Sequence, residues 1–294
     1  MSSAPARLRV GVISAGRVGA VLGAALAAAG HSVVAASAVS DASRRRAAEL
    51  LPTARIAAPP EVLDGIDLAL LAVPDDELPE LVAGLAAVGA FRAGTLVAHT
   101  SGRYGLGVLD PAREAGCLPL ALHPAMTFTG SDTDLPRLRG ASFGVTAPDE
   151  LVVVAQALVL EMGGEPVTIA DELRATYHAA LSHGANHLVT LVGQAGDLLR
   201  AAGAEDPAKI LGPLLTAALD NTLRSGDAAL TGPVARGDAG TVAAHLAAVA
   251  EHGPTALPAY TELARATADR ALAARLLAPS GAATLLGVLA RGQR

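Results

Sequence analysis

The chain has 294 residues, a length that suits two domains of ordinary size. Its formal net charge is −6 without a long run of either sign, and it contains three tyrosines, three phenylalanines and no tryptophan. These features argue against nucleic acid or an anionic membrane as the main partner. The single cysteine, Cys117, excludes a disulfide framework and a cysteine-rich zinc site within one chain, and we expect a reducing cytoplasm.

Apolar residues make up 51% of the chain, and most of the excess is alanine. The best candidate for a membrane span, Val18–Gly30, is shorter than the roughly 20 apolar residues that a spanning helix needs. A signal peptide also fits poorly, because Arg17 interrupts the apolar segment that it would need and no convincing cleavage context follows. The composition therefore predicts a soluble protein without a membrane partner.

Short apolar runs alternate with Ala-rich helical segments in the first part of the chain. The expected strands are Leu8–Ile13, Ser32–Ala36, Asp67–Val73, Thr95–His99, Leu118–Leu122, Ser142–Thr146 and Pro166–Ile169. Val18–Ala29 and Leu78–Val88 are long enough for helices between them. This alternation is typical of βα units on a parallel sheet, and it predicts a Rossmann-type domain over residues 1–170.

After Asp171 the strand signal ends, and apolar residues recur at helical spacing. The expected helices are Leu173–Ala202, Pro207–Arg224, Gly240–His252 and Leu257–Leu277. Asp206 and Asp238 are expected at helix starts, and Gly203 and Gly253 at helix ends. The fold class is thus α/β, a Rossmann-type parallel-sheet domain followed by an all-helical second domain over residues 171–294.

A glycine-containing turn joins the first expected strand to the first expected helix. The candidate cofactor-binding residues in this turn are Ser14, Ala15, Gly16, Arg17, Val18 and Gly19. They match the dinucleotide fingerprint with serine at the first glycine position, and the start of the helix offers free N–H groups to a pyrophosphate. The alternative is a tight turn without a ligand.

The end of the second expected strand bears on the choice of cofactor. Ser37 stands where NAD enzymes usually carry an acid for the ribose hydroxyls, and Ser40 and the Arg44–Arg46 cluster follow. An arginine here would attract a 2′-phosphate, so NADP is preferred and NAD remains possible. The alternative is that Arg44 belongs to a solvated helix face. Val73 and Pro74, at another strand end, are expected to flank the cofactor, and Asp75 and Asp76 could cap the next helix.

Two more strand ends carry polar side chains, in His99–Gly102 and around His123. Both fall at the edge of the sheet where the nicotinamide should lie. A histidine there could protonate the oxygen of a carbonyl that accepts hydride, so His123 is the candidate acid and Ser101 a candidate site residue. The alternative is a histidine hydrogen-bonded within a loop.

Four segments resemble the family of Rossmann-like and DUF2520 domain proteins: residues 98–102, 120–128, 177–180 and 231–238. The resemblance implies an NAD(P)-binding domain followed by a helical domain of uncharacterised function. More distantly, the chain resembles the 6-phosphogluconate dehydrogenase-like superfamily, which includes prephenate dehydrogenase, pyrroline-5-carboxylate reductase and ketopantoate reductase. Prephenate dehydrogenases carry a catalytic histidine in a His-Pro-Met-Phe-Gly segment, and His123–Met126 matches that position.

The chain departs from the hydroxyacid dehydrogenases of this superfamily, which use a lysine four residues before an asparagine on the first interdomain helix. Asn186 fits the asparagine, but Ser182 occupies the lysine position, and Lys209 is the only lysine. Unless Lys209 reaches the site, either His123 supplies the proton or the chain does not catalyse that chemistry.

Polar residues crowd the helical segment that begins the second domain: Tyr177, His178, Ser182, His183, Asn186 and His187. They could line a substrate site or an interface. His183 and His187 have the spacing of metal ligands, yet no glutamate lies between them, and we predict no metal. Arg236, on the later loop 231–238, could hold a substrate carboxylate or simply support a structural turn.

The leading hypothesis is an NADP-dependent reductase of a small carbonyl compound, such as the 2-oxo acid ketopantoate. His123 would donate the proton, Ser101 and Asn186 would orient the carbonyl, and Arg236 would bind the carboxylate. The alternative is an NAD(P)-binding sensor or interaction protein without turnover, which the absent lysine favours; a serine hydrolase on Ser101 is remote because no nucleophile elbow is present. By analogy with the superfamily, we expect a homodimer formed through the helical domain.

Overall fold

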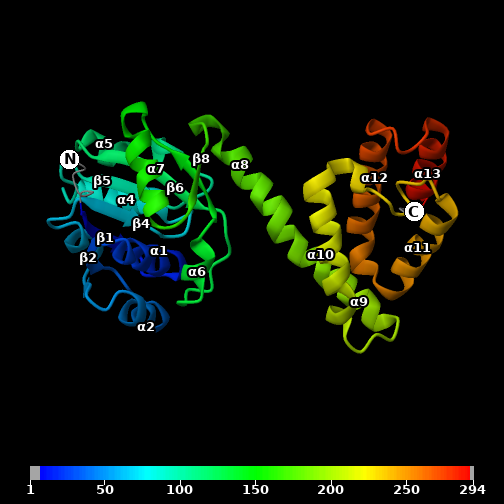
Figure 1. Cartoon of the computed structure of the whole chain (residues 1–294), viewed down its shortest axis with the longest axis horizontal. Helices are drawn as coiled ribbons and strands as arrows, with labels where there is room; N and C mark the ends of the chain where they lie inside the picture. The colour runs from blue at the N-terminus through cyan, green and yellow to red at the C-terminus, as the bar shows by residue number, and fades with distance from the viewer. Residues whose placement is uncertain (1–6, 292–294) are drawn as a thin grey trace. The chain divides into compact units, whose positions relative to one another are not determined.

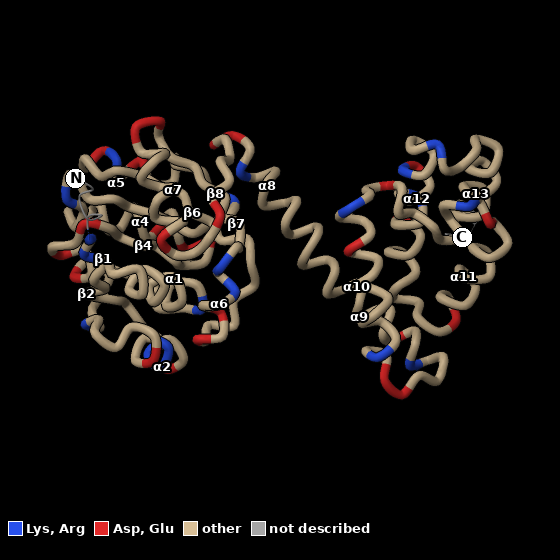
Figure 2. Tube along the Cα trace, in the orientation of Figure 1, with Lys and Arg blue, Asp and Glu red and all other residues tan. Residues whose placement is uncertain are grey.

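The computed structural model describes residues 7–291 of the chain, and its contacts divide the chain into two compact units after Ser182. All strands of the described residues lie in the first unit, and the second unit is helical (Figure 1). The sequence placed the domain boundary near residue 170, whereas these contacts leave the segment from Asp171 to Ser182 with the first unit. Charges of both signs are interspersed along both units (Figure 2).

The first unit is built on one eight-stranded sheet. Its strands are β1 (Arg9–Ile13), β2 (Ser32–Ala36), β3 (Arg55–Ile56), β4 (Leu68–Leu71), β5 (Leu96–His99), β6 (Leu118–Pro124), β7 (Ser142–Thr146) and β8 (Glu165–Thr168). Their order across the sheet is β3-β2-β1-β4-β5-β6-β7-β8. Every strand expected from the sequence is present. Only β3 was missed, because two residues are too few to show a period.

One strand runs against the expectation of a parallel sheet. β7 pairs antiparallel with β6, with Ala121 opposite Thr146 and Pro124 opposite Phe143. The segment between β6 and β7 contains only α6 (Asp134–Leu138), which is too short to carry the chain back along the sheet. A parallel crossover needs such a return, so β7 starts at the carboxyl end of β6 instead. The other pairings are parallel, including β7 with β8.

Helices surround the sheet of the first unit, and most of them pack on one of its two faces. They are α1 (Arg17–Ala28), α2 (Asp41–Leu50), α3 (Pro59–Val62), α4 (Leu78–Ala87), α5 (Asp110–Glu114), α6, α7 (Val152–Glu161) and α8 (Arg174–Leu181), with 3₁₀ turns η1 (Leu106–Leu109), η2 (Asp149–Leu151) and η3 (Asp171–Leu173).

Two buried clusters lie on opposite sides of the sheet, because successive strand residues point to opposite faces. Val10 and Val12 of β1 pack in one cluster with α1 and α7. Ile13 packs in the other with α3, α4 and α5. Both faces are therefore covered, as a mostly parallel sheet requires, and only the strand ends remain open for a site.

The second unit contains α9 (His187–Ala201), α10 (Pro207–Ser225), α11 (Ala239–His252), α12 (Leu257–Ala273) and α13 (Pro279–Arg291), with 3₁₀ turns η5 (Gly226–Ala229) and η6 (Pro254–Ala256). Asp206 and Asp238 are the N-caps of α10 and α11, as expected. The helical segment expected over Leu173–Ala202 is present as α8, a π-helix η4 (Ser182–Asn186) and α9, which follow one another without a break. Among residues 7–291, no helix combines the length and apolarity that crossing a membrane requires.

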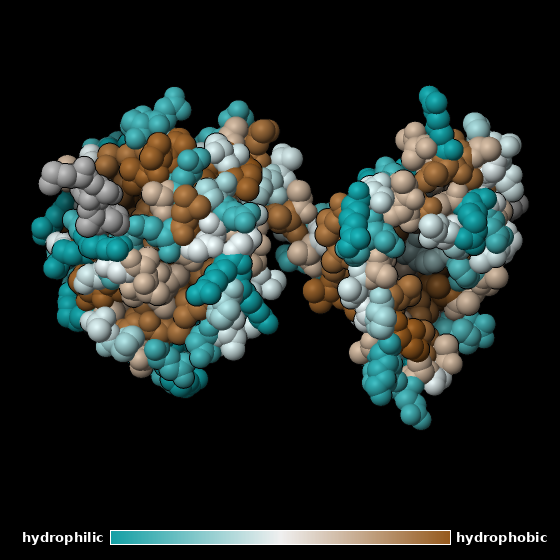
Figure 3. All heavy atoms as spheres, viewed as in Figure 1, coloured by the Kyte–Doolittle hydropathy of each residue, from teal (hydrophilic) through white to brown (hydrophobic). Residues whose placement is uncertain are grey.

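Apolar side chains are exposed on α9 and α10 of the second unit, and apolar residues also gather on its visible face (Figure 3). The exposed members are Leu188, Val189, Leu191, Ile210, Leu214, Leu219 and Leu223. The core of this unit lies elsewhere, between α11, α12 and α13.

Candidate functional site

The turn after β1 is held by Ser37 at the end of β2. The N–H of Ser14 donates to Ser37 Oγ at 2.8 Å, and the N–H of Ala15 donates to the Ser37 carbonyl at 2.7 Å. Ser14 has a φ of +74°, a conformation that favours glycine, which explains why the fingerprint normally begins with glycine. Ser37 is buried, and its hydroxyl organises the turn.

The two glycines of this turn have different steric surroundings. A β-carbon on Gly19 would lie 2.1 Å from the Ser14 carbonyl oxygen and 2.9 Å from Ala72 Cβ, so only glycine lets α1 pack this closely. At Gly16, the N-cap of α1, a β-carbon would meet only Ser14 Oγ, at 3.3 Å. No side chain caps this end of α1 and no acid lies in its first turn. The turn thus has the backbone and the free N–H groups that suit an anion.

The arginines of α2 point to different surroundings. Arg44 is exposed and pairs with Asp41 at 3.5 Å, and Ser40 is the N-cap of α2, accepting the Ser43 N–H. Arg46 instead lies beside the loop after β6. A β-carbon on Gly130 of that loop would be 2.6 Å from Arg46 Nε and 3.0 Å from Arg17 Cα. Arg46 therefore lies beside the start of α1.

The other residues expected near a cofactor lie in the first turn of α1 and directly after β4. Val18 is half-buried in the first turn of α1 and packs against the core, and Arg17 is exposed. Val73 and Pro74 follow β4, which neighbours β1, with Val73 half-buried and Pro74 exposed.

The ends of β5 and β6 meet the start of α8 in a cluster of rings. His123 Nδ1 and Tyr177 Oη are hydrogen-bonded at 3.0 Å. The His178 ring stands edge-on to the His123 ring, with centroids 5.8 Å apart. Since β1, β4, β5 and β6 are mutually parallel, this cluster lies at the same carboxyl edge of the sheet as the fingerprint turn.

Two glycines make room for this cluster. A β-carbon on Gly102 would lie 2.7 Å from His178 Cδ2 and 2.9 Å from His123 Nε2. One on Gly144, which pairs with His123 across the antiparallel strands, would lie 2.8 Å from Tyr177 Oη. The reversed strand β7 thus provides the surface on which the Tyr177 ring packs.

Burial changes the pKa values of His123 and Tyr177 in opposite directions. Burial, with the nearby Arg174 and His178, lowers the pKa of His123 to about 4. Burial also raises the pKa of Tyr177, and this outweighs the opposite effects of Arg174 and a backbone hydrogen bond from Gly144. The phenol therefore keeps its proton while the imidazole carries no charge.

Arg174, one turn before Tyr177, connects strand β7 to the loop that follows β5. Its guanidinium donates to the Ser101 carbonyl at 2.5 Å, to the Gly144 carbonyl at 3.3 Å and to Thr146 Oγ1 at 3.1 Å. The sequence analysis did not single it out. The available signal was an arginine three residues before a tyrosine, at the spacing of one helix face.

His99 and Ser101 support the loop after β5. His99 is fully buried; its Nδ1 accepts the Ser101 N–H at 3.2 Å, so its Nε2–H faces the Gly105 carbonyl at 3.1 Å. Burial, then Arg174, lowers the pKa of His99 to about 3. Ser101 Oγ accepts the N–H groups of Arg103 and Tyr104.

The remaining candidates lie in or next to the second unit. Asn186 is exposed at the end of the π-turn, and Arg236 is exposed with its guanidinium bonded to the carbonyl of Thr231 on its own loop. The rings of His183 and His187 are in contact, with Nδ1 atoms 3.1 Å apart. Within residues 7–291 no group of three or more potential metal ligands is brought together.

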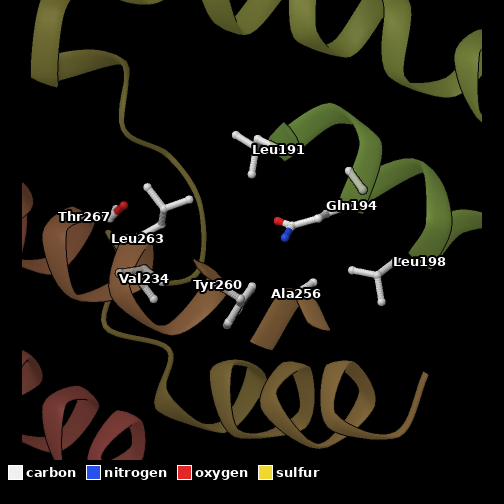
Figure 4. Close-up of a pocket in the computed structure, with 10 residues that line it drawn as sticks. Leu191, Gln194, Leu198, Val234, Ala256, Tyr260, Leu263 and Thr267 are labelled. Atoms are coloured by element: carbon white, nitrogen blue, oxygen red, sulfur yellow. The ribbon is translucent and has the colours of Figure 1, made fainter. Parts of the chain in front are cut away.

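The second unit contains a cavity of about 280 Å³ between α9 and α12 (Figure 4). Leu191, Leu198 and Leu263 line it, and the Gln194 carboxamide points into it. Tyr260, also in its lining, is hydrogen-bonded to the exposed His245 at 2.9 Å. No charged residue and none of the expected site residues lines this cavity, so we place the candidate site in the first unit.

Family models match most of the chain in two parts. Residues 2–124 match the Rossmann-like domain, and residues 141–267 match the domain of unknown function DUF2520. The chain thus combines a region that matches the Rossmann-like domain with a region that matches DUF2520. The DUF2520 region begins directly before β7, so it contributes Gly144, Arg174 and Tyr177 to the candidate site. The Rossmann-like region contributes Gly102 and His123. A search of curated proteins found no match.

Similar solved structures share the fold of this chain. An inferred NADP oxidoreductase of Bacteroides fragilis has 21% identity and a TM-score of 0.73, with 90% of this chain and 98% of that chain covered. An imine reductase from Myxococcus stipitatus, in complex with NADP+, has 17% identity and a TM-score of 0.65, with 97% and 100% covered. A reductive aminase from Aspergillus terreus, in complex with NADPH and ethyl levulinate, has 17% identity and a TM-score of 0.61, with 84% and 88% covered.

Proposed function

We propose that this protein is an NADP-dependent reductase of a small carbonyl or imine compound. The observation that carries the proposal is the Tyr177–His123 hydrogen bond. It lies at the carboxyl edge of the sheet, the edge at which the fingerprint turn follows β1. In open α/β sheets dinucleotides bind across this edge, so a proton donor here can act on a substrate beside the nicotinamide. The NADPH, NADP+ and imine chemistry named for structures of the same fold supports it.

The residues of the fingerprint turn suit the cofactor. The free N–H groups at the start of α1 and the open space above Gly16 would accept the pyrophosphate. Arg46 and Arg17 would lie near a 2′-phosphate, and Val73 and Pro74 would flank the cofactor after β4. When bound, NADPH supplies the hydride. Ser37, at the end of β2, accepts the Ser14 N–H, and because its side chain is neutral it would not repel a 2′-phosphate.

We assign proton donation to Tyr177. The sequence analysis gave that role to His123, but an imidazole with a pKa of about 4 is almost entirely unprotonated at neutral pH. The Tyr177 hydroxyl keeps its proton and can give it to the oxygen or nitrogen that receives negative charge as the substrate is reduced. His123 then holds the hydroxyl in place through Nδ1.

The identity of the substrate remains a prediction from the sequence. A 2-oxo acid such as ketopantoate requires a group for its carboxylate, and Arg236 is the candidate; Ser101 and Asn186 are candidates to orient the carbonyl. An imine would not need Arg236. Arg236→Gln therefore separates the two classes, because it should weaken turnover of 2-oxo acids and leave turnover of neutral imines unchanged.

The test is a binding and turnover assay on the purified full chain. NADPH and NADH are titrated by nicotinamide fluorescence, and NADPH oxidation is followed against 2-oxo acids, cyclic imines and prephenate-like compounds. We expect tighter binding of NADPH than of NADH, and turnover with at least one carbonyl or imine class. Binding without turnover across the panel would favour the sensor alternative, and absence of binding would refute both.

We also propose that the protein is a homodimer formed through the second unit. α9 and α10 expose a row of large aliphatic side chains, and exposed apolar patches of this kind usually mark an interface. Sedimentation analysis should give twice the mass of 29.2 kDa, and Leu219→Lys with Leu223→Lys should return the monomer. A wild-type monomer across the concentration range would contradict the proposal.

A further inference from the structure

Arg174 is a buried cation with no carboxylate at ion-pair distance among residues 7–291. It is 1% exposed, and within residues 7–291 its guanidinium forms no ion pair. Arginine is almost never fully buried unless it is paired, because the charge loses its hydration. A buried charge of this kind beside a candidate site suggests that the charge has a role in that site.

The contacts of Arg174 hold the charge in one place. Its three hydrogen bonds go to uncharged oxygens of Ser101, Gly144 and Thr146, and its buried Nε has no partner. These oxygens hold the guanidinium between β7 and the loop after β5 without cancelling its charge. The positive field is therefore available to the groups beside it.

The groups beside it are those of the proposed reaction. The guanidinium carbon lies 5.9 Å from the centroid of the Tyr177 ring. Its positive charge lowers the pKa of His123 and of His99, and the negative charges of Asp171 and Asp75 favour the charged form of Arg174 itself. His178 also lowers the pKa of His123. A cation here disfavours a protonated imidazole and favours a phenolate, and both effects are strengthened by burial.

We propose that Arg174 is a positioning residue whose fixed charge keeps the His123 ring neutral and hydrogen-bonded to Tyr177 and favours the negative charge that Tyr177 acquires as its proton leaves. The inference rests on the proposed function. In that reaction the Tyr177 O–H bond breaks, its proton joins the substrate oxygen or nitrogen and its electron pair stays on Oη. NADPH, when bound, would supply the hydride to the substrate and become NADP+, and a proton taken up from solvent would reprotonate Tyr177.

The first test is a titration that does not depend on turnover. His123 is followed by NMR of ¹³C-labelled histidine between pH 8 and pH 5 in the full chain, with its signal assigned from His123→Asn. In the wild type the ring should remain neutral over this range. In Arg174→Gln it should begin to protonate within the range, because removal of a nearby cation raises the pKa of an imidazole.

Two variants of Thr146 sharpen this titration. Thr146→Val removes one hydrogen bond of Arg174 and keeps the charge, so His123 should behave as in the wild type. Thr146→Asp places a carboxylate beside the same guanidinium, so the pKa of His123 should rise as it does in Arg174→Gln. This variant keeps the test available if Arg174→Gln does not fold. An unchanged His123 titration in both Arg174→Gln and Thr146→Asp, or equal shifts in Thr146→Val, would overturn the proposal.

The second test asks whether Arg174 acts through Tyr177. Arg174→Gln should lower kcat by about 10- to 100-fold with little change in KM, as expected for a fixed charge that acts mainly on the transition state. In a Tyr177→Phe background the same change should have little further effect. If no substrate is turned over, the proposed function fails, and the titration alone decides the effect of Arg174 on His123. If turnover occurs and the two changes multiply, the inference about Arg174 fails and the proposed function stands.

Discussion

Replacing Tyr177 by phenylalanine should lower kcat for NADPH-dependent reduction by about 10²- to 10⁴-fold, the range expected for loss of a positioned acid. The substitution removes one oxygen and leaves the ring against Gly144 and near Arg174, so the fold and the affinity for NADPH should be preserved. Stopped-flow measurement of NADPH oxidation gives the rate, and fluorescence titration gives the cofactor affinity.

Tyr260→Phe is the matched control. Tyr260 also bonds to a histidine Nδ1 through its hydroxyl, at 2.9 Å, and burial also raises its pKa, but it belongs to the second unit. It should leave kcat unchanged. If Tyr177→Phe is as active as the wild type while His123→Ala is inactive, the acid is His123, as the sequence analysis expected.

Replacing Arg46 by alanine should weaken NADPH binding by about 10- to 100-fold and leave NADH binding unchanged. A charge-assisted hydrogen bond to a phosphate contributes about 1.5–3 kcal/mol, and only NADPH carries the 2′-phosphate. Arg46 is assigned this role because its Nε lies beside Gly130 and the start of α1. Isothermal titration with both cofactors measures the two affinities.

Arg44→Ala serves as the control for this prediction. Arg44 is two residues away on the same helix, carries the same charge and pairs with Asp41 at the surface. We expect it to leave both affinities unchanged, which separates a specific contact from the general charge of α2. A larger loss of NADPH affinity in Arg44→Ala than in Arg46→Ala would return the role to Arg44, where the sequence analysis placed it.

The sheet could be predicted from the sequence because its signals are local. Apolar runs of four to seven residues, separated by helical segments, predicted seven of the eight strands. Gly19 could be interpreted in advance because close helix–strand packing excludes any side chain there. The reversed direction of β7 could not be predicted, since direction depends on how the preceding connection crosses the sheet and a short run of residues does not encode it.

The candidate site was predicted only in part. His123 stood out because it ends a strand at the edge where ligands bind, and that position follows from sequence order. Its neutral state did not, because the pKa of His123 depends on burial and on Arg174. Tyr177 was noticed as a polar residue on a helix, but nothing local indicated that its hydroxyl meets His123, which is 54 positions away.

The sequence by itself determined the order of strands and helices, the fingerprint turn and the strand ends where chemistry is expected, because each is written in the spacing of consecutive residues. Only the tertiary structure decided that Arg46 lies beside the start of α1, that Arg174 is buried with no ion pair among residues 7–291, and that burial lowers the pKa of His123 and raises that of Tyr177. These depend on distances between segments far apart in the chain and on the loss of solvent around their charges, and both arise only when the segments pack together.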